Sequence, residues 1–217
     1  MIEKNNNKIL LNSINKQYFV GISLGSNATA ETGIAVVDRS LNLLRIDKIF
    51  NIEDLELYIK NLGPADNIII CMDLPKNTNM VNGKWRIESR HINPFKLIMP
   101  DNPKFNWAER FSDRGVEFCN TLSSLSIDTY RYYCYFTKNI LKLSSPYKPR
   151  SPADCKHLQM SIKNNLKISG IPSNMIALSG LDAILGAYTA WKLSTSQENI
   201  GYKFIGDYKN TPIATAL

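Results

Sequence analysis

The chain has 217 residues, of which 44% are apolar, and it carries a formal net charge of +7 at pH 7. This length is enough for one domain with a hydrophobic core. No apolar run approaches the roughly 20 residues that a membrane-spanning helix needs, so we expect no membrane partner. The basic balance is compatible with a nucleic-acid partner, although a general abundance of Asn, Lys and Ile would also raise the number of surface lysines.

The chain contains four cysteines: Cys71, Cys119, Cys134 and Cys155. They show no CxxC spacing, which favours free thiols in a reducing compartment, and we expect a cytoplasmic protein. The first residues are rich in Asn and Lys and have the pattern of neither a signal peptide nor a transit peptide. We therefore expect an N-terminal extension over residues 1–17 and a single domain over residues 18–217.

The first elements of this domain read as strands. Residues 18–24 and 32–38 predict a hairpin around the small-residue turn 25–31, and the alternating residues 42–50 predict a third strand. Apolar residues at helical spacing then predict a helix over 52–62, which Gly63 and Pro64 end.

The continuous apolar run 67–72 predicts a central strand that is covered on both faces. Because a helix precedes it, we expect this strand to lie parallel to the strand 18–24, its neighbour, after a right-handed crossover. Residues 74–108 contain four prolines and no persistent period, which indicates a functional loop or lid.

The second half of the chain predicts helices and further strands. In chain order we expect a helix over 108–125, a strand over 127–136, a turn over 144–152, a helix over 153–168, a connector over 171–175, a helix over 180–193 and one or two short strands over 200–208. The small residues of the last helix favour close packing on a sheet. The fold class is therefore α/β, with a mixed central sheet and helices on both faces.

Two carboxylates are candidates for catalysis and for metal binding. Asp73 ends the buried strand, where ligands of open α/β sheets gather, but it could instead cap the following turn. Asp182 lies near the start of the last helix, and its alternative is a capping box with Ser179. If Asp73 and Asp182 approach each other without a metal, their repulsion should raise the pKa of one of them.

Ser23 lies on the first strand, at a position where a third carboxylate would complete a metal site. A hydroxyl is a weak ligand for a hard cation, so Asp73 and Asp182 could hold one Mg²⁺ or Mn²⁺ ion, whereas two ions normally need a bridging carboxylate. Four other acids could compensate, although the sequence does not place them: Glu31, Glu88, Asp113 and Glu117.

Further residues are candidates for substrate binding. Gly25 and Ser26 lie in a small-residue turn whose backbone N–H groups could cradle a phosphate, or which could be a simple hairpin turn, and Ser23 on the preceding strand is a candidate beside them. Lys148 and Arg150 flank a proline in a basic segment and could contact a nucleic-acid backbone. The preceding run 127-IDTYRYYCYF-136 could stack bases, or it could be an ordinary half-buried strand.

Three motifs together resemble a known family. GISLGS with TGIAVVD, IIICMDLPK and SGLDAILGAYTAW are similar to the "domain of unknown function 429" family, whose members are regarded as predicted nucleases of the ribonuclease H-like fold. The motifs frame residues 18–212, and residues 80–170 match only loosely. Members usually carry Asp where this chain has Ser23, so one carboxylate of the implied metal site is missing.

The resemblance implies a ribonuclease H-like fold and a metal-dependent nuclease or phosphodiester hydrolase, with Asp73 and Asp182 as catalytic residues and Mg²⁺ or Mn²⁺ as cofactor. One alternative is a non-catalytic binding or scaffold protein on the same fold. A second is a phosphate-binding protein, because the first hairpin also resembles that of the actin-like ATPase and sugar kinase superfamily. That superfamily needs a second such hairpin, which this chain does not show.

Overall fold

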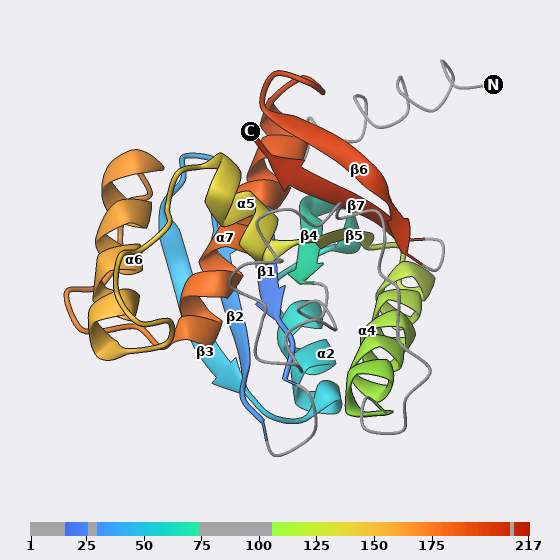
Figure 1. The fold of residues 1–217 in the computed structure, drawn as a ribbon. Coiled ribbons are helices and arrows are strands. Elements are labelled where there is room, and N and C mark those ends of the chain that lie inside the picture. Colours follow the sequence, from blue (N-terminus) through green and yellow to red (C-terminus); the bar gives the residue numbers. More distant parts are fainter. Residues whose placement is uncertain (1–15, 26–29, 74–105, 209–210) are drawn as a thin grey trace.

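A seven-stranded mixed sheet runs through the part of the chain that the computed structural model describes, which comprises residues 16–25, 30–73, 106–208 and 211–217 (Figure 1). The strand order is β3-β2-β1-β4-β5-β7-β6. Strands β1, β4, β5 and β7 are parallel neighbours at the centre, and antiparallel strands lie outside them. The predicted mixed α/β architecture is confirmed.

The N-terminal half follows the predicted order. The strands β1 (Tyr18–Ser23), β2 (Thr32–Val37) and β3 (Leu43–Ile49) form an antiparallel meander. Helix α2 (Ile52–Lys60) and the short turn η1 (Ala65–Asn67) lead into β4. Because this connection contains a helix, it can return the chain parallel to its starting direction.

Strand β4 (Ile68–Asp73) is buried along its whole length, as its continuous apolar run predicts. It lies between β1 and β5, and its register with β1 pairs Ile22 with Met72. The predictions of a central strand parallel to β1 are therefore confirmed. This register brings the carboxyl ends of β1 and β4 together.

The C-terminal half contains these elements: α4 (Asn106–Ser124), β5 (Asp128–Tyr132), α5 (Cys134–Ile140), α6 (Pro152–Asn165), α7 (Leu178–Thr195), β6 (Tyr202–Tyr208) and β7 (Thr211–Ala216). Helices α4, α6 and α7 agree with prediction, but α5 was not predicted, and the strand expected over 127–136 is wrong at its end. The chain leaves the sheet after Tyr132, and α5 begins at Cys134. Aromatic residues favour strands in general, so this helix start gave no local signal.

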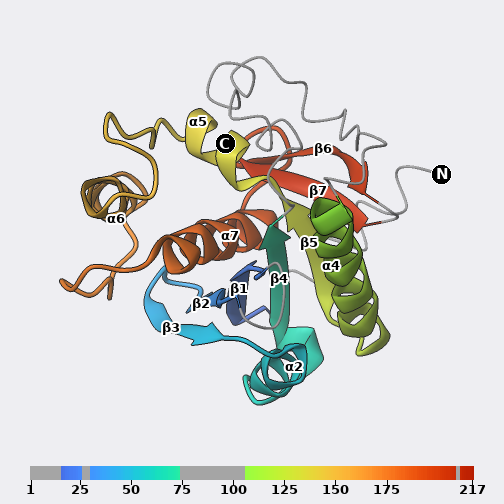
Figure 2. The same ribbon diagram turned by 60° about the horizontal axis from the view of Figure 1, so that its bottom comes forward.

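Helices cover both faces of the sheet, as expected (Figure 2). On one face, Phe19 and Cys71 belong to the same core as Leu181 and Ile184 of α7. On the other face, the core combines residues of β1 and β4 with residues of α2 and α4: Val20, Ile22, Ile70, Met72, Leu55, Ile59, Phe118 and Leu122. Alternate residues of one strand thus enter opposite cores.

Helix α7 lies against β1 with backbone touching backbone. A Cβ at Gly21 would overlap the Ala183 carbonyl oxygen and the Ala187 nitrogen. A Cβ at Gly186 would lie 3.0 Å from the Gly21 Cα and 2.9 Å from the Cys71 carbonyl oxygen. The small residues that predict close packing are therefore required by it, and they set the height of α7 above the sheet.

Two predicted segments lie largely outside the described residues. The first is the N-terminal extension, of which the structure describes only residues 16 and 17. Lys16 is buried, donates to the Ile68 carbonyl oxygen at 2.9 Å and pairs with Asp128 at 2.8 Å. The second is the loop over 74–108, of which residues 106–108 form the start of α4 and the rest is not described.

Candidate functional site

Asp73 lies at the carboxyl end of β4 and is only 6% exposed. One carboxylate oxygen accepts a hydrogen bond from the Ser23 hydroxyl at 2.9 Å, and the other accepts one from the Leu24 backbone N–H at 2.9 Å. Both donors come from the end of β1, because the parallel register aligns the two strand ends. The sheet edge therefore brings together the two strand-end residues that the sequence predicts.

Asp182 lies one turn into α7 and is 2% exposed. The capping-box alternative is wrong, because the helix begins at Leu178 and its N-cap, Ala177, makes no side-chain hydrogen bond. The Ser179 hydroxyl instead donates to Glu31 at 2.6 Å. Since Asp182 does not cap its own helix, another interaction must compensate for the burial of its charge.

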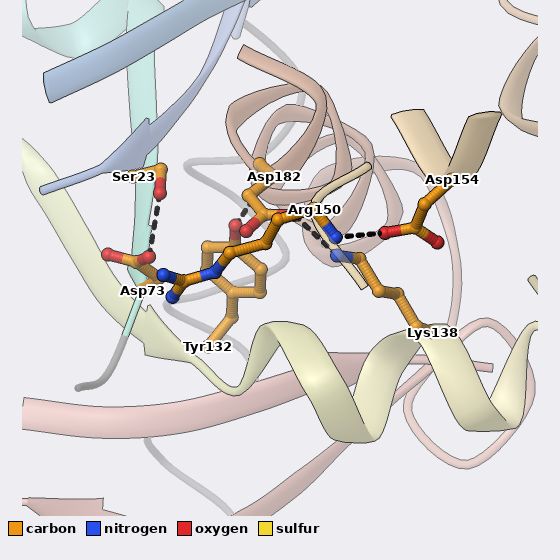
Figure 3. A network of polar contacts seen from close by, with 7 residues as sticks. All are labelled: Ser23, Asp73, Tyr132, Lys138, Arg150, Asp154 and Asp182. Carbon is orange, nitrogen blue, oxygen red and sulfur yellow. Dashed lines mark hydrogen bonds and ion pairs between the residues drawn. The ribbon is translucent and has the colours of Figure 1, made fainter. Parts of the chain in front are cut away.

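Lys138 of α5 provides that interaction. Its ammonium nitrogen lies 2.5 Å from Asp182 Oδ1, and the two side chains are 18% and 3% exposed (Figure 3). The Tyr132 hydroxyl, at the end of β5, donates to the Asp182 backbone carbonyl oxygen. Sequence reasoning missed Lys138, because an isolated lysine in a short helix carries no pattern that separates it from surface lysines.

The pKa of Asp73 is raised from its ordinary value of 3.8 to about 6. Burial is the main cause, and the negative charge of Asp182 adds to it, while the hydrogen bonds from Leu24 and Ser23 and the charge of Arg131 act in the opposite direction. The direction agrees with the expectation for two carboxylates that approach each other. The larger contribution, however, is loss of water rather than repulsion.

The pKa of Lys138 shifts above its ordinary value. Burial is the largest single cause and by itself would lower the pKa of this ammonium, but the charge of Asp182, the interaction with Cys134 and the hydrogen bonds to both residues together outweigh burial. Lys138 therefore stays protonated at neutral pH, and the pair with Asp182 is a true ion pair.

Arg131 supports the site from the α4 side. It is 1% exposed, and one guanidinium nitrogen donates to the Asp73 backbone carbonyl oxygen at 2.8 Å. Tyr132 is also fully buried, so neither residue is available to a base. The stacking interpretation of the aromatic run is wrong for these two residues, because β5 lies inside the sheet between β4 and β7.

The other predicted substrate-binding residues have different positions. The Gly25 N–H donates to the Thr32 hydroxyl at 2.9 Å, so this donor is already engaged and unavailable to a phosphate. Ser26 lies outside the described residues. Lys148 and Arg150 are exposed before α6, and the Arg150 backbone N–H donates to Asp154 at 2.7 Å. Figure 3 shows the Arg150 side chain in the same close-up as Asp73 and Asp182.

The spare acids do not complete a metal centre among the described residues. Glu31 pairs with Lys48 at 2.8 Å, and that contact, together with the Ser179 hydroxyl, lowers the pKa of Glu31. Glu117 is exposed on α4, whereas Glu88 and the side chain of Asp113 are not described. Within the described ranges, no group of three or more His, Cys, Asp or Glu residues could hold a metal ion.

The donor set at the β1 and β4 edge can be compared with the Mg²⁺ or Mn²⁺ that the resemblance implies. Carboxylate and hydroxyl oxygens are suitable ligands for a hard cation, and each Asp73 oxygen keeps acceptor capacity beyond its one hydrogen bond. Lys138 already takes part of the capacity of Asp182. The described residues therefore fit one divalent ion and do not fit a pair.

Comparisons of the chain with family models, with curated proteins and with solved structures found no match in any of the three. Among the helices of the described residues, none is long and apolar enough to span a bilayer.

Proposed function

We propose that this chain is a phosphodiester hydrolase of the ribonuclease H-like class, that it uses one Mg²⁺ or Mn²⁺ ion, and that its substrate is nucleic acid. The antiparallel strands β1, β2 and β3, followed by β4 and β5 parallel to β1, support this class. The observation that carries the proposal is the convergence of Asp73 and Asp182, both buried, at the carboxyl end of β4.

In this proposal the protein positions its carboxylates with fixed neighbours. Ser23 and Leu24 orient Asp73, while Lys138 orients Asp182. A bound divalent ion would polarise the phosphorus–oxygen bond and lower the pKa of the attacking water. Lys148 and Arg150 supply positive charge for neighbouring phosphates of the nucleic-acid substrate. A cytoplasmic location belongs to the same proposal, and the four cysteines, which are buried and form no disulfide, are consistent with it.

A second candidate is a nucleic-acid-binding protein without hydrolytic activity. The Lys138–Asp182 ion pair favours it, because this pair neutralises one carboxylate without any metal. Ser23 also favours it, because a neutral hydroxyl lies where a third carboxylate would complete a metal site. The two candidates differ in one measurable property, which is metal-dependent cleavage.

The test is a cleavage assay on labelled single-stranded and double-stranded DNA and RNA, with Mg²⁺, with Mn²⁺ and with EDTA. We expect cleavage with a divalent ion and none with EDTA. Asp73→Asn and Asp182→Asn should each lower the rate by about 100-fold or more, because each removes a charged ligand. Asp66→Asn, at an exposed position in η1, is the matched control and should leave the rate unchanged.

Absence of cleavage by the wild type on all four substrates, in a preparation that still binds one of them, would reject the hydrolase and leave the binding protein. Cleavage that survives both Asp73→Asn and Asp182→Asn would show that the active site lies elsewhere.

A further inference from the structure

Lys138 has more hydrogen-bonding capacity than its ion pair uses. A lysine ammonium has three donors. Asp182 accepts one, and the interaction with Cys134 engages a second. The side chain keeps 18% exposure, so it is not sealed inside the core. In the view of Figure 3, the Asp182 carboxylate lies between Lys138 and the Ser23–Asp73 pair. Within the part of the chain that the structure describes, the third donor meets no acceptor, so it can bind an oxygen that arrives at this site.

Among the described side chains, two cations contact the two carboxylate residues without any metal. Asp73 and Asp182 contribute two negative charges when both are ionised, and Lys138 and Arg131 contribute two positive charges in contact with the same residues. One divalent ion would give the site a net charge of two positive units, and the negative charge of an incoming phosphate group would lower this net charge. A second divalent ion would give four positive charges among the described side chains, with no further carboxylate to offset them.

We propose that Lys138 takes the place of a second metal ion: its ammonium holds Asp182 and binds a non-bridging oxygen of the substrate phosphate, so that the site takes up one divalent ion. This inference rests on the proposed function, since it concerns the same site. Lys138 is then a substrate-binding residue.

The experiment measures the number of Mn²⁺ ions bound by isothermal titration calorimetry, and the affinity for a labelled 12-nucleotide single-stranded DNA in EDTA. Lys138→Met removes the charge and keeps most of the chain length. Lys138→Arg keeps the charge, and Lys142→Met is the matched control on an exposed lysine. All variants are compared as full chains.

The wild type should bind one Mn²⁺. Lys138→Met should bind Mn²⁺ about 10-fold more tightly or take up a second ion, because Asp182 is released from its internal cation. Its affinity for the DNA in EDTA should fall, and the log–log salt slope should fall by roughly 0.7, the value for one lost phosphate contact on a single strand. Lys138→Arg and Lys142→Met should behave like the wild type in both measurements.

Unchanged Mn²⁺ stoichiometry and affinity in Lys138→Met, together with unchanged DNA binding, would overturn the inference and leave the proposed hydrolase intact. The experiment also distinguishes a failure of the proposed function from a failure of this inference. If the wild type binds no Mn²⁺ while Lys138→Met binds it, the one-ion hydrolase is rejected and the role of Lys138 is supported.

Lys138→Met leaves Asp182 buried without its cation, which destabilises the fold, so a second variant tests the inference in case Lys138→Met does not fold. If Lys138→Met does not fold, Ser23→Asp tests the inference, because this variant adds a carboxylate to the site and keeps Lys138. The inference expects tighter binding of a single Mn²⁺ ion to Ser23→Asp. Uptake of two ions by Ser23→Asp would overturn it, since Lys138 would then not exclude the second ion.

Discussion

Asp73 is the residue whose environment has the clearest consequence for stability. Its pKa rises from 3.8 to about 6 on folding, so the folded state binds the proton more tightly than the unfolded state. The resulting stabilisation is fully present below pH 4 and is lost as pH rises through 6. A shift of about two units corresponds to about 3 kcal/mol of unfolding free energy.

Asp73→Asn should remove this dependence, because an amide does not ionise. Between pH 4 and pH 7, the unfolding free energy of the wild type should fall by about 2.4 kcal/mol relative to that of Asp73→Asn, because the carboxyl of the unfolded chain is already partly ionised at pH 4. Urea denaturation of both proteins at the two pH values measures the difference, with Asp66→Asn as the control that should follow the wild type. Parallel pH profiles for wild type and Asp73→Asn would contradict the assignment of a buried, raised pKa to Asp73.

Ser23 offers a second prediction at the level of single residues. Ser23→Asp places a third anionic ligand beside Asp73 and should strengthen Mn²⁺ binding about 10-fold. At a saturating Mn²⁺ concentration, this gain should raise the metal-induced shift of the melting temperature by about 3 °C. Thermal scans with Mn²⁺ and with EDTA measure the shift. If Ser23→Asp gains nothing while Asp73→Asn keeps the response of the wild type, these residues bind no metal.

The elements of the fold differ in how much their own sequence specifies. The buried strand β4, the hairpin of β1 and β2, and the small-residue helix α7 carry strong local patterns, and all were predicted close to their bounds. The end of β5 was not, because its aromatic run continues unbroken into α5. Strand β7 lies beyond the segment that was read as the terminal strands, and only its pairing with β5 and β6 identifies it.

In the candidate site, too, some residues follow from local sequence patterns and others only from the three-dimensional structure. Asp73 was predicted from the end of an apolar strand, and Asp182 from the start of a helix that packs closely, so both follow from local patterns. Lys138 could not be predicted, since its importance depends on where α5 lies relative to α7 rather than on its neighbours in the chain. The engagement of the Gly25 N–H by Thr32 also became visible only in three dimensions.

The contact between α7 and β1 leads to a prediction at the level of elements. Gly21→Ala would force a Cβ into backbone atoms of Ala183 and Ala187, which cannot move independently of the helix. We expect a loss of unfolding free energy of about 3 kcal/mol or more, by overpacking. Chemical denaturation provides the measurement.

Gly115→Ala is the matched control for Gly21→Ala. The new Cβ would lie 2.7 Å from a guanidinium nitrogen of Arg131, at the far end of a flexible side chain. Alanine also favours the helix by about 1 kcal/mol over glycine. The cost should therefore be clearly smaller than that of Gly21→Ala, and equal costs would show that backbone contact does not set the position of α7.

At the scale of the whole molecule, the net charge of +7 gives a prediction for nucleic-acid binding. If Arg150 contacts a phosphate, Arg150→Ala should lower the slope of log affinity against log salt by roughly 0.7–0.9. Anisotropy titrations at several salt concentrations measure the slope. Lys203→Ala, at an exposed position on β6, is the control and should keep the wild-type slope. Equal slopes for Arg150→Ala and the wild type would remove Arg150 from the interface.

The contact between Gly21 and Gly186 also has a consequence for how the molecule forms. It joins the first strand of the described chain to its last helix, so the entropy of closing a very long loop must be lost before the contact stabilises anything. Asp73 and Asp182 can therefore meet only once the chain has folded nearly throughout. We expect folding to be slow for a protein of this size, and a partly folded chain to have no site at all.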